Sequence, residues 1–114
     1  MKFMLMFFDT AANQVYATET GQSTMAAWGA YAGAMGQAGA VVAGHGLQGR
    51  ETATTLRLRD GVRQVQDGPF ADTKEQLGGY FVIDVASLDD ALAWAARSPT
   101  AATGTVEVRP VLAM

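Results

Sequence analysis

The stretch "GYFVIDVASLDDALAWAARSP" at residues 79–99 decides the fold of this chain. Its apolar beginning, Tyr80–Val85, predicts a strand. Ser87 and Asp90 then form a capping box, which predicts a helix over Leu88–Arg97. Pro99 ends this helix, because proline disfavours helical backbone in the residue before it. A strand that leads directly into a capped helix is a building unit of α+β sandwiches, and the other elements are placed around it.

Similar patterns lie on both sides of this stretch. Towards the C-terminus, Thr105–Val111 alternates between polar and apolar residues and predicts the last strand. Towards the N-terminus, Lys2–Phe8 is a continuous apolar run, which predicts a central strand covered on both faces. Ser23 or Thr24 caps a first helix that runs to about Ala38.

Each predicted helix carries an apolar stripe at helical spacing. The stripe residues are Met25, Trp28, Tyr31 and Met35 in the first helix, and Leu88, Ala91, Leu92 and Ala95 in the second. A second stripe on the first helix consists of small residues, namely Ala26, Gly29, Gly33, Gly36 and Ala40. Each mid-helix glycine costs roughly 1 kcal/mol relative to alanine. The small stripe therefore indicates close approach to a sheet or a partner, although a composition rich in Ala and Gly explains it equally well.

The segment between the helices reads as strands. Val41–Gly49 is a short strand and loop, Thr52–Arg59 alternates, and Val62–Asp67 is the return strand after a turn at Asp60 and Gly61. The order strand, helix, two or three strands with a hairpin, helix, strand predicts an α+β, ferredoxin-like sandwich. Both helices would cover one face of an antiparallel sheet. The bare face calls for a second copy of the chain, so we expect a homodimer.

The composition excludes several classes of function. The 114 residues suit one domain, 1–114, and a net charge of −3 with eight scattered Lys and Arg residues argues against a nucleic-acid partner. The absence of cysteine excludes a disulfide framework, a thiol nucleophile and a cysteine–zinc site. The apolar N-terminal run is too short for a signal sequence or a membrane span, so we expect a cytoplasmic protein with no membrane partner.

The segment "GHGLQG" at Gly44–Gly49 matches a dinucleotide-binding pattern literally. A strand pattern rather than a helix follows it, so nucleotide binding is not expected. His45, the only histidine, lies in this glycine-rich segment without an adjacent acid. We interpret it as a loop histidine, with a general base as the alternative. No metal and no other cofactor are expected.

The connection "QDGPFADTKEQLGGYFV" at residues 66–82 is the candidate site. Counting the hairpin register back from its two-residue turn places Asp67 opposite Thr54, on the face of Leu56 and Val65. A carboxylate on an apolar face needs partners, or its pKa rises. Asp67 is therefore the candidate catalytic acid or base. The alternative interpretation is that Asp67 caps the turn through its own backbone.

Further ligand-binding residues are expected around this carboxylate. Lys74 with Arg57 or Arg109 would contact an anion, Phe70 and Tyr80 would form walls, and Thr73 and His45 complete the set. A pocket that contains Asp67 would favour a small-molecule enzyme or binding protein without a cofactor. A filled interior with an exposed apolar patch would favour a non-catalytic partner module.

The segment "VQDGPFADTKEQLGGYFVIDVASLDDALAWAARSP" followed by "GTVEVRPVL" resembles the DGPF-domain family of the YCII-related group. Together with "KFMLMFF", "GHGLQ" and "ATTLRLRDG", the resemblance covers nearly the whole chain, and the tetrapeptide at residues 67–70 gives the family its name. The resemblance implies a dimeric α+β barrel of two ferredoxin-like subunits in the bacterial cytoplasm. It implies no settled activity.

Catalysis by a His–Asp pair is suspected in YCII-related proteins, and the resemblance implies that Asp67 corresponds to the Asp of that pair. The His of those relatives lies in their first helix, but the matching helix here, Thr24–Ala38, contains no histidine. The resemblance also implies a link to sigma-factor regulation, because DGPF proteins are often encoded beside extracytoplasmic-function sigma factors. Two functions therefore stay open: small-molecule binding or conversion near Asp67, and a dimeric partner module in sigma-factor-linked regulation.

Overall fold

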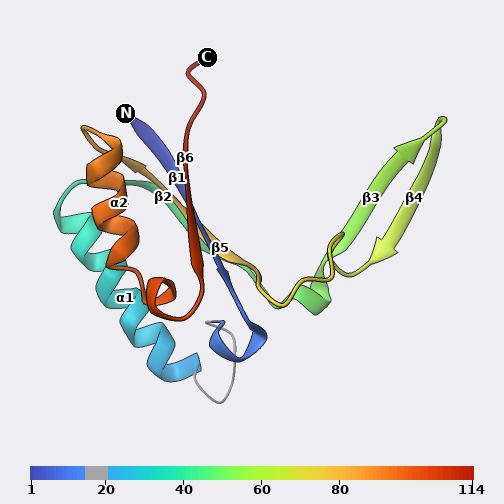
Figure 1. Ribbon diagram of the computed structural model, residues 1–114, viewed down its shortest axis with the longest axis horizontal. Helices are drawn as coiled ribbons and strands as arrows, with labels where there is room; N and C mark the ends of the chain where they lie inside the picture. The colour runs from blue at the N-terminus through green and yellow to red at the C-terminus, as the bar shows by residue number, and fades with distance from the viewer. Residues whose placement is uncertain (15–20) are drawn as a thin grey trace.

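The computed structural model describes residues 1–14 and 21–114. In chain order the elements are β1 (Lys2–Asp9), α1 (Gly21–Gln37), β2 (Val41–Gly46), β3 (Thr54–Arg59), β4 (Val62–Asp67), β5 (Gln76–Asp84), α2 (Leu88–Ala96) and β6 (Thr105–Pro110). Short 3₁₀ turns occupy residues 11–13, 50–52 and 99–102. Figure 1 shows both helices on one side of the main sheet. The predicted α+β, ferredoxin-like sandwich is confirmed.

The main sheet has four strands in the order β2-β5-β1-β6, and each neighbouring pair is antiparallel. Along β1 the side chains alternate between two environments, as the pleat of a strand requires. Phe3, Leu5 and Phe7 are buried beneath the helices, whereas Met4 and Met6 are only half-buried on the other side. The prediction that β1 is covered on both faces is therefore not met by a single chain.

We call the sheet surface remote from the helices the open face. Residues opposite one another on neighbouring strands share a face, so Met4 and Met6 define it. Its other members are Phe8 on β1, Ala43 and His45 on β2, Leu77, Tyr80 and Val82 on β5, and Thr105, Glu107 and Arg109 on β6. Lys2 and Asp84, which pair at one end of β1 and β5, belong to it too. Apolar side chains thus occupy the middle of its central strands, and the charged ones lie at one end of these strands and on the edge strand β6.

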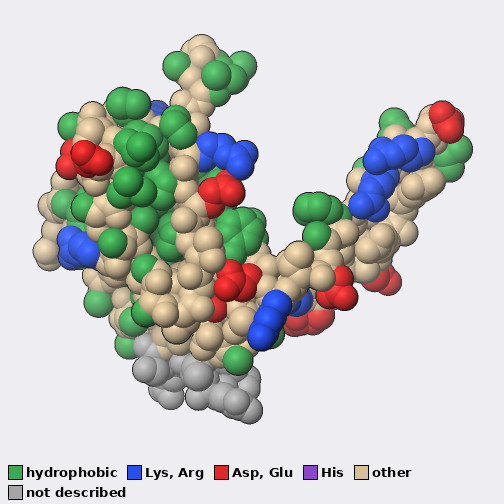
Figure 2. Space-filling model, viewed as in Figure 1, with side chains coloured by type: hydrophobic (Ala, Val, Ile, Leu, Met, Phe, Trp, Pro, Cys, Tyr) green, Lys and Arg blue, Asp and Glu red, His purple; other side chains and the backbone are tan. Residues whose placement is uncertain are grey.

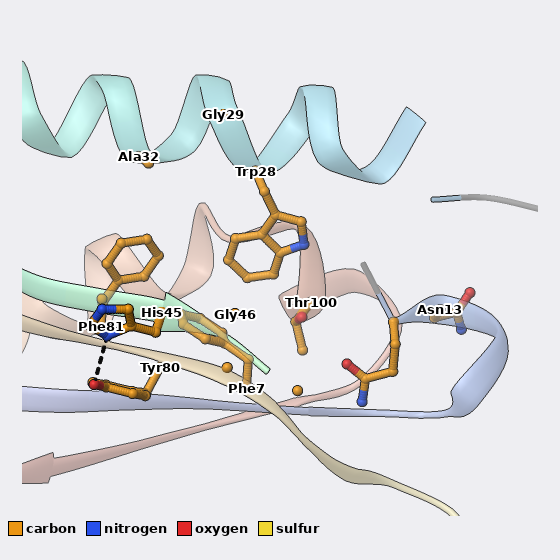
Figure 3. Close-up of a pocket in the computed structure, with 14 residues that line it drawn as sticks. Phe7, Asn13, Trp28, Gly29, Ala32, His45, Gly46, Tyr80, Phe81 and Thr100 are labelled. Atoms are coloured by element: carbon orange, nitrogen blue, oxygen red, sulfur yellow. Dashed lines mark hydrogen bonds between the residues drawn. The ribbon is translucent and has the colours of Figure 1, made fainter. Parts of the chain in front are cut away.

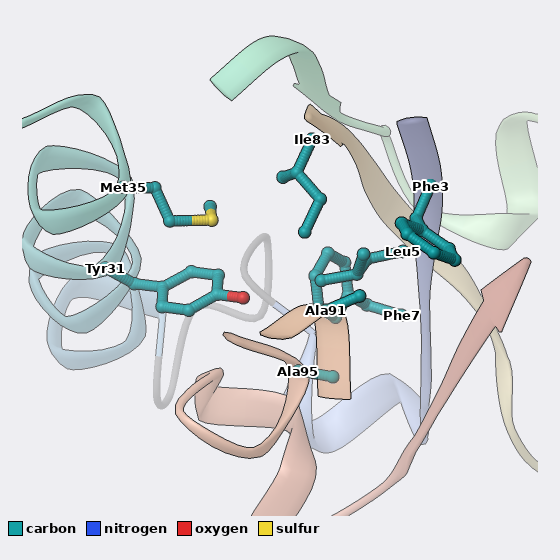
Figure 4. Close-up of a cluster of buried hydrophobic side chains, with 8 residues drawn as sticks. All are labelled: Phe3, Leu5, Phe7, Tyr31, Met35, Ile83, Ala91 and Ala95. Carbon is teal, nitrogen blue, oxygen red and sulfur yellow. The ribbon is translucent and has the colours of Figure 1, made fainter. Parts of the chain in front are cut away.

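The hydrophobic core lies between the sheet and the helices (Figure 4). Its buried members are Phe3, Leu5, Phe7, Tyr31, Met35, Ile83, Ala91 and Ala95. The Tyr31 ring packs edge-on against Phe7 and Phe81, and its hydroxyl donates to the carbonyl of Trp94 at 2.8 Å. Burial raises the pKa of Tyr31 to about 12, while the charge of Arg97 acts in the opposite direction.

Helix α1 begins at Gly21, so Ser23 and Thr24 lie within the helix and the predicted cap is wrong. Of the predicted apolar stripe, three residues pack in or against the core: Trp28, Tyr31 and Met35. Met25 is instead 63% exposed, because it lies near the start of the helix, outside the turns that pack on the core.

The small residues of α1 do not bring the helix close to the sheet. A Cβ atom added at Gly29, Gly33 or Gly36 would meet no atom within 4 Å. These glycines therefore face open space, and the prediction of close approach to the sheet is wrong. Ala40, which follows the helix, is buried.

Helix α2 begins as predicted, because the Ser87 hydroxyl accepts a hydrogen bond from the backbone N–H of Asp90. Its buried face differs from the predicted stripe. The buried residues are Ala91 and Ala95, whereas Leu88 and Leu92 are about half exposed. The large ring of Trp94 packs against the core instead, and turning the helix towards this ring moves both leucines outward.

The hairpin of β3 and β4, residues 54–67, forms the arm. Its register is the predicted one, with Thr54 opposite Asp67 and Arg59 opposite Val62. Asp60 and Gly61 both have positive φ, as a two-residue hairpin turn of the primed type requires. The arm is a separate two-stranded sheet that projects from the domain (Figure 1). The radius of gyration is accordingly 15.6 Å, against about 13 Å for a compact domain of this length.

Candidate functional site

A cavity of about 280 Å³ lies between α1 and the main sheet (Figure 3). Three aromatic rings line it: Trp28 from α1, Phe7 from β1 and Phe81 from β5. The rings of Phe7 and Trp28 meet edge to face at 4.8 Å between centroids, and those of Phe7 and Phe81 at 6.0 Å. Edge-to-face packing holds each ring against the next, so the cavity has firm apolar walls.

Four glycines border the cavity where β2 and β5 pair: Gly44, Gly46, Gly78 and Gly79. A Cβ atom at Gly44 would overlap the ring of Phe81, and one at Gly79 would lie 2.9 Å from the carbonyl oxygen of His45. Glycine inside a strand often marks a close approach of backbone or ligand. The backbone itself therefore bounds this side of the cavity. The segment that follows "GHGLQG" leads to the strand β3, as expected, and not to a helix.

The remaining walls include polar side chains from Asn13, Gln14 and Thr100. Gln14 is only 5% exposed, and its side-chain nitrogen donates to the carbonyls of Asp9 at 3.1 Å and Gln76 at 2.9 Å. These bonds hold the amide in place where the end of β1 meets the start of β5. The cavity thus combines aromatic walls with a few oriented polar groups, the usual makeup of a small-molecule site.

His45 and Tyr80 also border the cavity, and among its described lining residues they alone are ionisable. The His45 Nδ1 atom and the Tyr80 hydroxyl oxygen are 2.9 Å apart and share a hydrogen bond (Figure 3). Because Phe81 faces the helices, the adjacent Tyr80 faces the open face, and His45 opposite it does the same. The pair is therefore oriented away from the aromatic walls, although its residues border the cavity.

The structure corrects the premise behind the loop interpretation of His45. The residue lies in β2 and not in a glycine loop, and it has a partner in Tyr80. The two residues are 35 positions apart in the chain, so only the pairing of β2 with β5 brings them together.

Asp67 lies at the end of β4, at the root of the arm, and is exposed. Its register opposite Thr54 is the predicted one, but its apolar neighbours Leu56 and Val65 are themselves 56% and 59% exposed. It does not line the cavity between α1 and the sheet. Within one chain the carboxylate therefore faces solvent, and a catalytic role for it stays a prediction.

The other predicted ligand-binding residues are spread over the molecule. Arg57 lies on the arm, Phe70 beside its root is 74% exposed, and Thr73 and Lys74 lie in the loop before β5. Arg109 lies on β6, where its guanidinium pairs with the carboxylate of Glu107 at 2.6 Å. Of the eight predicted site residues, the structure brings together only His45 and Tyr80 at the cavity. The binding roles of the rest stay predictions.

The polar loop before β5 is held by side-chain hydrogen bonds, most of which go to its backbone carbonyls. The side-chain nitrogen of Gln76 donates to the carbonyl of Ala71 at 2.6 Å and to the hydroxyl of Thr73 at 3.0 Å. The Arg50 guanidinium donates to the carbonyls of Thr73 at 2.9 Å and Lys74 at 3.1 Å, and to that of Asp9 in β1 at 3.2 Å. Arg50 therefore clamps the loop, and with it the root of the arm, onto the sheet.

Sequence reasoning assigned Trp28 to the core and did not single out Phe7, Phe81 or Gln14. A signal for the cavity was available in the glycines of β2 and β5. Pairs of glycines in two strands that lie side by side remove side chains from one patch of the sheet. That the two strands pair was not known from the sequence.

Residues 1–14 and 21–114 contain neither a candidate metal site nor a helix that could span a membrane. No group of three or more His, Cys, Asp or Glu side chains there could hold a metal ion. Neither described helix has the length and apolar character needed to cross a membrane.

A family model described as the YCII-related domain matches residues 1–114. "Uncharacterized protein R00369" of Rhizobium meliloti (strain 1021) is 54% identical over 61 residues, which are 52% of this chain and 49% of that protein. The match thus spans about half the length of this curated relative.

Among solved structures, the fold is similar to that of 5-chloro-2-hydroxyhydroquinone dehydrochlorinase (TftG) from Burkholderia phenoliruptrix AC1100, in a complex with 2,5-dihydroxybenzoquinone. The TM-score is 0.56 and the sequence identity is 13%, over 98% of this chain and 94% of the other. At this identity the likeness concerns the fold alone.

Proposed function

Since the chain belongs to the YCII-related domain family and its fold encloses an aromatic-walled cavity, we propose that it binds a small aromatic molecule without a cofactor. The cavity formed by Phe7, Trp28 and Phe81 carries this proposal. It moves the expected binding site from Asp67 to the space beneath α1.

The size of the cavity suits a single substituted ring. An apolar cavity of about 150 Å³ is enough to hold benzene in another protein, and ligand sites usually begin at about 300 Å³. A volume of about 280 Å³ therefore leaves room for a six-membered ring with a few substituents. Rings that pack edge to face also prefer an aromatic ligand to an aliphatic one of equal size.

The polar groups of the cavity favour a ring that carries oxygen. Asn13 and Thr100 offer amide and hydroxyl groups, and Gln14 offers its amide oxygen, because its nitrogen already donates to two backbone carbonyls. No Asp, Glu, Lys or Arg is among the described residues that line the cavity. A hydroxylated or quinone ring fits this lining better than a carboxylate or phosphate. The solved protein of similar fold holds such a molecule, 2,5-dihydroxybenzoquinone, which makes this compound a suitable first probe.

Tryptophan fluorescence tests the proposal, because Trp28 lines the cavity and Trp94 does not. In a Trp94→Phe background, titration with 2,5-dihydroxybenzoquinone or a hydroxylated benzene should quench Trp28 to a saturating level. Ala32→Phe would place a ring in the cavity from α1 and should abolish saturation. Ala30→Phe, on the exposed side of the same helix, is the matched control and should leave binding intact. Equal quenching in both variants would contradict binding in this cavity.

We also propose that two copies pair through the open face. Met4, Met6, Phe8 and Val82 are half-buried there, and covering them removes apolar surface from water. Sedimentation of Met6→Lys tests the pairing, because a charge at the centre of the interface should yield monomers. A monomeric wild-type protein at micromolar concentration would exclude it.

The second candidate function is a non-catalytic partner module. One observation favours it, namely the projecting arm with its exposed apolar side chains. Retention of the fold without any saturable ligand binding would favour this candidate over the first.

A further inference from the structure

The arm leaves all four of its apolar side chains more than half exposed. These residues are Leu56, Leu58, Val62 and Val65, each between 56% and 61% exposed. An isolated two-stranded hairpin is at best marginally stable in water, and an uncovered apolar edge strand attracts another chain. The arm therefore needs a covering surface, which the described part of its own chain does not supply.

We propose that the arm clasps a second copy of this chain, seated between the arm and the open face. Figure 1 shows the helices on one side of the sheet and the arm standing off from the other side. Figure 2 shows the hollow that separates the arm from the body of the domain. A copy that covers the open face must occupy this hollow. The clasp thus rests on the pairing through the open face proposed above, and it gives the arm a role in that dimer.

Charge favours a copy of the same chain as the occupant. The arm has a net charge of +1, because it contains three arginines (Arg57, Arg59 and Arg63) and two aspartates (Asp60 and Asp67). The whole chain has a net charge of −3, so the rest of it carries −4. Figure 2 shows the basic side chains along the arm. The net charges of the arm of one copy and the body of the other are therefore opposite, which favours their encounter.

Surface area favours the same occupant. Four strands about 4.8 Å apart and six residues long, at about 3.3 Å per residue, give the open face a flat area of about 400 Å². Two such faces bury about 800 Å², or somewhat more because side chains protrude from the flat surface, whereas stable interfaces bury about 1,200–2,000 Å². In a two-fold dimer each arm contacts the other copy, so two arms add to one interface.

Deletion of the arm tests its role directly. The Gly68 N–H donates to the Ala53 carbonyl at 2.7 Å, so the ends of the arm are already adjacent. Replacing residues 54–67 by Asn-Gly closes this gap with a two-residue turn that keeps the same hydrogen bond. We expect the dissociation constant of the dimer, measured by sedimentation velocity, to rise at least 100-fold. The helical signal in circular dichroism and the quenching of Trp28 should be retained, which separates this result from unfolding and from failure of the ligand proposal.

Point variants locate the contact on the arm. Leu58→Asp adds a charge to the face shared with Leu56 and Val65, and we expect at least a tenfold weaker dimer. Gln64→Asp adds the same charge to the opposite face, next to Arg57, and should change the dissociation constant less than threefold. Equal effects of the two variants would contradict a contact through the apolar face.

The outcomes separate the two surfaces. An unchanged dissociation constant after deletion of the arm would overturn the clasp and leave pairing through the open face intact. Unchanged dimerisation of Met6→Lys, together with loss of the dimer on deletion, would overturn the seating of the second copy in the hollow. A wild-type protein that stays monomeric would overturn both.

Discussion

Replacing Arg50 by methionine removes the guanidinium that joins three segments but keeps much of the apolar stem. The lost contacts are hydrogen bonds to the carbonyls of Asp9, Thr73 and Lys74. The Arg50 Nε atom is buried without a described partner, so its removal offsets part of the loss. Three bonds from a charged donor contribute about 1.5 kcal/mol each, and one unsatisfied buried N–H costs about 1.5 kcal/mol. We therefore expect the free energy of unfolding to fall by about 3 kcal/mol.

Urea unfolding of Arg50→Met measures this loss, with Lys74→Met as the control. Lys74 is exposed in the same loop, and its substitution removes the same charge without touching the clamp. The control should change the free energy by less than about 0.5 kcal/mol. In a thermal scan the Arg50 variant should melt roughly 10 °C lower, at about 3–4 °C for each kcal/mol. A loss below about 1 kcal/mol would refute the reasoning, since water would then replace the guanidinium at all three carbonyls.

Three further predictions concern single side chains. Tyr31→Phe should lower the free energy of unfolding by about 1 kcal/mol at neutral pH, because the hydrogen bond to Trp94 is lost. Burial raises the pKa of Tyr31 in the folded state to about 12, so the stability advantage of the wild type should disappear as the pH rises from about 10 towards 12. A difference in urea unfolding that stays constant across that range would contradict the raised pKa. Asp67→Asn should change stability by less than about 0.5 kcal/mol and leave Trp28 quenching intact; a tenfold loss of affinity would restore this carboxylate to the site. His45→Ala should cost less than about 1 kcal/mol, because its bond to Tyr80 is exposed. Calorimetric titration should show unchanged ligand affinity, whereas a tenfold loss would place His45 in contact with the ligand.

Local signals in the sequence determined those features whose partners are near in the chain. The turn at Asp60 and Gly61 set the register of β3 against β4, because a two-residue turn leaves only one pairing. Ser87 set the start of α2, because its hydroxyl oxygen accepts a hydrogen bond from the backbone N–H of Asp90, only three residues further along the chain. The apolar run of β1 identified a central strand, and the order of elements then sufficed for the sandwich.

Only the tertiary structure decided the features that depend on distant segments. The sequence placed the hairpin between two helices but could not show that it stands apart from the main sheet, since β5 pairs with β1 and β2 instead. The hairpin register correctly placed Asp67 on the face of Leu56 and Val65, but it could not show whether another part of the molecule covers that face. The cavity joins Phe7, Trp28 and Phe81, which share no local pattern. These residues come together through long-range strand pairing and helix packing. Contacts between distant segments leave no periodic pattern in any single stretch of sequence, so the sequence did not reveal the cavity.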